Sequence, residues 1–135
     1  MPEKETIERA RKDAREGKSP STQAGEFVRE EMDHIREGKH GARSAKQAIA
    51  IGLSKARRAG VKLPAPKDGS ASPQTKAKAE HDLKAGRTHA KPSRARSQAT
   101  SAALRREGKQ AASPAALSRQ SRQSAKTRAK TRGAA

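Results

Sequence analysis

Large apolar side chains are scarce in this chain, and nearly all of them lie in its first half. Of 14 such residues, counting Met1, only Leu83, Leu104 and Leu117 follow residue 64. Burial of these side chains is the main favourable term in folding, so one core spanning all 135 residues is excluded. The chain therefore divides into a part that can build a small core and a part that cannot.

The charge is divided in a similar way. The formal net charge is +18, but residues 1–37 carry net −2, residues 38–67 carry net +8 without a single acid, and residues 68–135 carry net +12. Low hydropathy combined with high net charge is typical of a chain that is partly disordered. We therefore expect a small helical domain at 1–63, a linker rich in Pro, Gly and Ser at 64–72, and a basic tail rich in Ala, Lys, Arg and Ser at 73–135.

Helical periodicity indicates an all-α fold, because no segment alternates apolar and polar residues as a strand does. The clearest helix is predicted at 20–37, with Ser19 as its N-cap and Gly38 as its stop. Its apolar stripe consists of Ala24, Phe27, Val28, Met32 and Ile35. The acids Glu26, Glu30, Asp33 and Glu37 are expected to face away from that stripe.

A second helix, predicted at 42–59, should complete a hairpin with the first. Its apolar face consists of Ala45, Ala48, Ile49, Gly52, Leu53 and Ala56. The far side should present Arg43, Lys46 and Arg57, with Lys55 and Arg58 flanking them. A preceding helix at 3–16 would make a three-helix module. The tail is expected to be largely disordered or conditionally helical, with helices at 73–85, 94–107 and 114–130 forming on an anionic partner.

Residues for catalysis or metal binding are not evident. The four histidines, His34, His40, His81 and His89, show no zinc spacing, and there is no Cys. We therefore expect no enzyme activity, no cofactor, no metal and no small-molecule substrate. The longest apolar run, residues 48–53, is too short to cross a membrane, so no membrane association is expected. The lack of Cys and of a signal-peptide pattern favours a cytoplasmic protein.

The excess of positive charge points to a polyanion, and nucleic acid is the predicted partner. The absence of Tyr, Trp and Asn predicts phosphate contacts with little sequence preference. The candidate binding residues are Lys39, His40, Arg43, Lys46, Lys55, Arg57, Arg58, Lys62, Arg94, Arg96, Arg105, Arg106, Arg119, Arg122, Lys126, Arg128, Lys130 and Arg132.

Three strings carry a resemblance to a known family: STQAGEFVREE at 21–31, REGKHGARS at 36–44 and KQAIAIGLSKARRAG at 46–60. They resemble a family of small basic bacterial proteins of unknown function, whose members are often labelled DNA-binding. The resemblance covers about residues 1–66 and implies a bacterial, cytoplasmic protein without established catalytic residues. The remaining residues are similar in composition to the tails of linker histones and of bacterial histone-like proteins.

These observations favour a histone-like, nucleoid-associated protein that binds duplex DNA through its phosphates. One alternative is an RNA- or ribosome-associated basic protein, because basic tails that fold on binding serve RNA equally well. A second alternative is a helical protein-interaction module, in which apolar helix faces, or the acidic and basic helices, pair between two copies in a homodimer.

Overall fold

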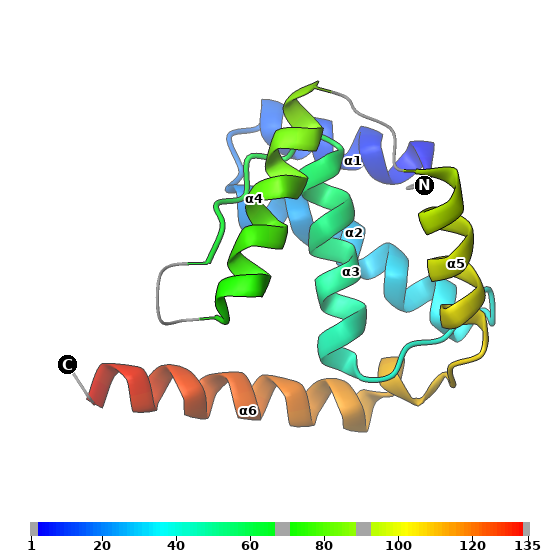
Figure 1. Ribbon diagram of the computed structural model, residues 1–135. Coiled ribbons are helices and arrows are strands. Elements are labelled where there is room, and N and C mark those ends of the chain that lie inside the picture. The colour runs from blue at the N-terminus through cyan, green and yellow to red at the C-terminus, as the bar shows by residue number, and fades with distance from the viewer. Residues whose placement is uncertain (1–2, 67–70, 89–92, 134–135) are drawn as a thin grey trace.

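The computed structural model describes residues 3–66, 71–88 and 93–133, and the side chains of these residues up to 130. Residues 67–70 of the predicted linker lie outside the described residues. Every regular element in the described ranges is a helix, which confirms the all-α prediction. The elements are α1 Lys4–Arg15, α2 Pro20–Arg36, α3 Ala45–Arg58, α4 Pro73–Thr88, α5 Arg94–Arg105, the 3₁₀ helix η1 Gln110–Ala112, and α6 Pro114–Gly133 (Figure 1).

Local capping signals set the ends of the hairpin helices. The Ser19 hydroxyl accepts a hydrogen bond from the backbone N–H of Thr22 at 3.3 Å, and Pro20 occupies the first position of α2. Gly38, at φ +80°, ends α2 in the left-handed conformation. Helix α3 begins three residues later than predicted, because Ser44 caps it through the N–H of Gln47.

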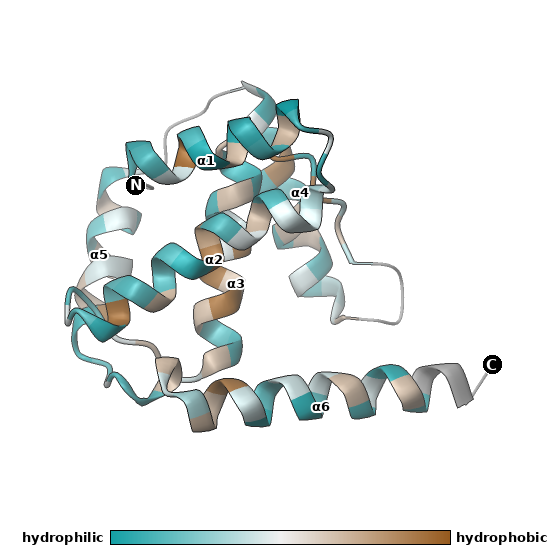
Figure 2. Ribbon diagram, turned by 180° about the vertical axis from the view of Figure 1, so that it is seen from behind, coloured by the Kyte–Doolittle hydropathy of each residue, from teal (hydrophilic) through white to brown (hydrophobic). Residues whose placement is uncertain are grey.

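The core lies between α2 and α3, with α1 packed on α2. Phe27 and Ile35 of α2 and Ala48 and Ala56 of α3 are almost fully buried, as the two apolar faces predict. Gly52 permits a close approach of the helices, since a Cβ atom there would lie 2.7 Å from Cα of Val28. Figure 2 shows hydrophobic colour gathered on α2 and α3, while the visible face of α1 is mainly hydrophilic.

The C-terminal elements differ in how much they pack. Helix α4 lies against α3, where Gly86 brings it so near the carbonyl of Arg57 that a Cβ atom would collide. Ala111 and Ala112 of η1 are buried against the α2–α3 core. Helix α5 buries no side chain and stands to one side of the bundle, and α6 runs along its base, in contact with α3 and η1 (Figure 1). These contacts cross the predicted boundary at 64–72.

Two predicted helix faces are wrong in part. Glu30, expected on the exposed face of α2, is only 3% exposed, because the start of α1 covers it and the backbone N–H of Glu3 donates to its carboxylate. Arg57, expected on the exposed basic face of α3, is only 8% exposed. Both errors arise because neighbouring segments cover faces that look solvent-exposed in an isolated helix.

Candidate nucleic-acid interface

The side chain of Arg57 is buried and forms hydrogen bonds within the protein. Its guanidinium donates to the backbone carbonyls of Leu63 and Pro64, at 3.2 and 3.0 Å. Burial lowers the pKa of Arg57, and the charge of Asp82 acts in the opposite direction. The residue therefore fastens the segment after α3 to the helix.

Arg58 is also engaged, through a network that joins α3 to α4. Its Nε lies 2.8 Å from Oδ1 of Asp82, a carboxylate that is only 1% exposed. The same carboxylate accepts hydrogen bonds from Lys78 of α4 and, at 2.7 Å, from Ser54 of α3. Burial would raise the pKa of Asp82, but these hydrogen bonds and the charges of Lys78 and Arg58 together lower it.

Three more candidates near the hairpin have acidic partners. Lys55 forms an ion pair with the fully buried Glu31, and Nε2 of His40 lies 3.1 Å from the other oxygen of Glu31. Lys39 lies 3.3 Å from Glu37 and 3.4 Å from Glu3, and hydrogen bonds with these two acids raise its pKa. All three side chains face carboxylates of the same chain.

Arg43 and Lys46 differ from these residues. Both side chains are exposed near the start of α3, and neither has an acidic partner within 4.0 Å in the part of the chain that the structure describes. The positive charge that α3 offers to solvent is therefore concentrated at this end.

Helix α6 carries the densest unpaired charge among the described residues. At about 100° per residue, four of its cations fall within about 80° of the helix circumference and form the α6 stripe, which spans about 16 Å. The stripe consists of Arg119, Arg122, Lys126 and Lys130, all exposed and without an ion pair to any described acid. Arg128 is exposed on another face, and Arg132 lies within α6 but its side chain is outside the described part.

The remaining candidates are scattered over α5 and the loops. Five of them are exposed and form no ion pair with the acids that the structure describes: Lys62, Arg94, Arg96, Arg105 and Arg106. Sequence reasoning missed Lys109, which is exposed and has its Nζ beside Gly38. Its membership in the third Arg-Glu-Gly-Lys string, after those at 15–18 and 36–39, is the signal that could have found it.

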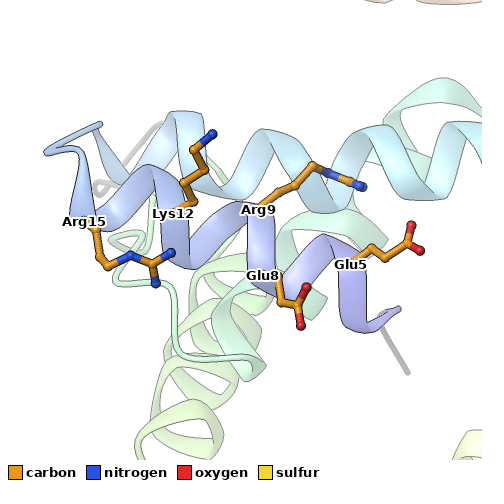
Figure 3. A pocket seen from close by; sticks show the side chains of 5 residues that line it. All are labelled: Glu5, Glu8, Arg9, Lys12 and Arg15. Atoms are coloured by element: carbon orange, nitrogen blue, oxygen red, sulfur yellow. The ribbon is translucent and has the colours of Figure 1, made fainter.

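A shallow hollow lies beside α1. Figure 3 shows that its lining side chains all come from this one helix, and they are Glu5, Glu8, Arg9, Lys12 and Arg15. All five are exposed, and Nε of Arg9 donates to the carboxylate of Glu26 on α2, at 3.1 Å. Charges of both signs along one helix face are typical of a solvated surface.

No helix within the described ranges combines the length and the apolar character needed to cross a membrane.

The structure thus defines an all-α protein with a hairpin core and outer helices that carry exposed cations. Residues 4–67 match a family of unknown function (DUF6496), which is consistent with the expected resemblance over 1–66 to an uncharacterised family. The match covers α1 to α3 and ends before α4. No curated protein and no solved structure matches the chain.

Proposed function

We propose that this chain binds the phosphate backbone of duplex DNA, with α6 as the principal contact. The observation that carries the proposal is the α6 stripe of exposed cations without described acidic partners. Lys and Arg contacts to phosphates release counterions, and this release supplies most of the affinity of non-specific binding. The exposed Arg43 and Lys46 would add contacts from the start of α3.

The dimensions of α6 fit this partner. A B-DNA duplex carries one charge per ~1.7 Å of axis and has a major groove ~12 Å wide that admits a helix. The stripe's ~16 Å therefore spans about nine phosphate charges. The stripe contains only Arg and Lys, and we propose that the contacts follow the backbone, with little preference for base sequence.

We further propose that α5 and α6 are conditionally helical and gain stability on the anion. Helix α5 buries no side chain, and the spacing of Arg122, Lys126 and Lys130 sets like charges four residues apart. Such pairs destabilise a helix by a few tenths of a kcal/mol each, to about 0.5, and neutralisation by phosphate would remove this repulsion. Circular dichroism should show more helix when duplex DNA is added, and the gain should disappear at high salt.

The biological setting that we propose is the bacterial nucleoid, in the cytoplasm, where such binding would favour compaction of DNA. A homodimer through the apolar helix faces stays a prediction, and within the chain these faces of α2 and α3 cover one another.

Competition binding between duplex DNA and ribosomal RNA over a salt series tests the proposal. If about eight phosphates are engaged, log K should fall with log salt at a slope near −7. Absence of binding at 50–100 mM salt, or a slope near zero, would contradict it. Clear preference for ribosomal RNA would favour the RNA-associated alternative instead.

A further inference from the structure

A cluster of histidines and glutamates lies where the C-terminal half of α2 meets the loop that follows it. Glu31, His34 and His40 each bring one ligand atom within 4.8 Å of the other two. Glu31 and His34 are three residues apart on α2 and therefore share a helix face. His40 joins them because Gly38 turns the chain back after α2. The sequence spacing did not predict this cluster, since its third member lies outside the helix.

The carboxylate at the centre of the cluster is incompletely satisfied. Glu31 is fully buried, and Lys55 contacts its Oε1. Its Oε2 lies 3.1 Å from Nε2 of His40, within ion-pair distance, but it accepts no hydrogen bond of adequate geometry. Leaving a buried carboxylate oxygen without such a bond is unfavourable, because the oxygen has lost its hydrogen bonds with water. The buried Oε2 of Glu31 is thus available to a ligand inside the cluster.

Both imidazole rings are held by other oxygen atoms. Nδ1 of His40 lies 2.8 Å from the carbonyl oxygen of Gly41, and a carbonyl only accepts, so Nδ1 is the donor there. This tautomer leaves the lone pair of Nε2 directed away from the backbone. Nε2 of His34 lies 3.1 Å from a carboxylate oxygen of Glu3. Histidines that bind metals commonly have such a carbonyl or carboxylate partner on the second ring nitrogen.

We propose that Glu31, His34 and His40 bind one divalent transition-metal ion, with Zn²⁺ the best match. Two imidazole nitrogens and one carboxylate oxygen are a common zinc ligand set, and water can fill a fourth position. Ligands about 2.0–2.1 Å from a tetrahedral ion lie about 3.3 Å apart, close to the observed separation of Oε2 and Nε2. Mg²⁺ and Ca²⁺ fit less well, because both prefer oxygen ligands throughout.

The bound ion would fasten the loop after α2 onto the helix. Lys55 stays on Oε1 of Glu31, so the metal needs only the oxygen that lacks a hydrogen bond. This site is separate from the exposed cations of α6, and its occupancy does not depend on nucleic-acid binding.

Calorimetric titration of the full chain with Zn²⁺ alone tests the site. The expected result is one ion per chain, with affinity reduced at least about tenfold in His34→Gln and in His40→Gln. His81→Gln is the matched control, because His81 is exposed on α4 and lies outside the cluster of Glu31, His34 and His40. It should change the affinity less than about twofold. Far-UV circular dichroism establishes that each variant is folded.

An NMR titration of the unaltered chain decides the question even if a variant fails to fold. Zn²⁺ should shift the ring signals of His34 and His40 and leave that of His81 unchanged. Absence of stoichiometric uptake, or equal shifts at His81, would overturn the proposal and leave His40 and Glu31 as an ion pair only.

Discussion

Helices α3 and α6 have similar compositions but use their positive charges differently. Both are rich in Ala, Lys and Arg, and neither contains an acid. In α3, Lys55, Arg57 and Arg58 contact buried carboxylates or backbone carbonyls. In α6, the cations with described side chains are all exposed, and none has an acidic partner among the described residues. Net charge therefore does not measure what a helix can offer to a polyanion.

The neighbours of each helix explain the difference. Helix α3 lies between α2 and α4, which supply Glu31 and Asp82. Helix α6 contacts α3 and η1, and neither of these elements contains an acid. Burial against other elements brings acids to Lys55 and Arg58 of α3, while the cations of α6 stay available to external anions.

Neutralising the α6 stripe should have the largest effect. The variant Arg119→Gln, Arg122→Gln, Lys126→Gln, Lys130→Gln removes four phosphate contacts, and its affinity for duplex DNA should fall about 100-fold at 100 mM salt. Fluorescence anisotropy with a labelled duplex measures this change. Arg58→Gln is the matched control from α3 and should change affinity less than about twofold, because Asp82 already neutralises that charge. Equal losses in the two variants would refute the distinction between the helices.

Adding a side chain at Gly52, where α2 and α3 approach closely, should have the largest effect on the free energy of unfolding. In Gly52→Ala, the new Cβ would lie 2.7 Å from Cα of Val28, and the helices must separate at a cost of about 2–3 kcal/mol. Gly25→Ala, on the exposed face of α2 with nothing within 4 Å, should instead add about 0.5–1 kcal/mol of stability. Urea unfolding measures the free energy of unfolding of both variants. A Gly52→Ala protein as stable as the unaltered chain would contradict the close approach of the helices.

The Asp82 network predicts a dependence of stability on acid. The pKa of Asp82 is lower in the folded chain, so its stabilising contribution is complete above its ordinary value of 3.8 and is lost as pH falls below that value. Asp82→Asn should cost about 1–3 kcal/mol at neutral pH. Thermal melting from pH 6 to pH 2.5 should show that the difference in Tm between the two proteins narrows below pH 3.8. A difference in Tm that does not change with pH would argue against an ionised Asp82 in the folded state.

Removing helix caps should have the smallest effects on the free energy of unfolding. The size of each effect should distinguish a helix packed in the core from one that is not. Ser44→Ala removes the N-cap of α3, and we expect a loss of about 1 kcal/mol in unfolding free energy. Ser93→Ala removes the equivalent cap of α5, a helix that buries no side chain, and global unfolding should not change measurably. Equal losses in the two variants would show that α5 unfolds together with the core.

Local signals in the sequence predicted the helices well, and long-range contacts account for the errors. Ser19 and Gly38 marked the ends of α2 because caps and stops depend on adjacent residues. The burial of Arg57 depends on carbonyls at Leu63 and Pro64, and the docking of α4 depends on Asp82 and Gly86. The residue pattern within one helix does not predict these contacts.

The candidate site shows the same limits. Composition identified the exposed cations of α5 and α6, because few neighbours cover those helices. It could not separate them from Lys55 and Arg58, whose acidic partners lie on other helices. The cluster of Glu31, His34 and His40 was missed because a loop brings its third member back to α2.

The salt dependence of duplex binding in two double variants tests the central claim most directly. The double variant Arg119→Gln with Lys126→Gln removes two cations of the α6 stripe. The double variant Lys55→Gln with Arg58→Gln removes two cations of α3 that form ion pairs with acids of the same chain. The slope of log K against log salt should become shallower by about 2 for the α6 pair and stay unchanged for the α3 pair. Equal changes of slope in two folded variants would contradict the claim that the α6 stripe offers its charges to nucleic acid while Lys55 and Arg58 of α3 do not.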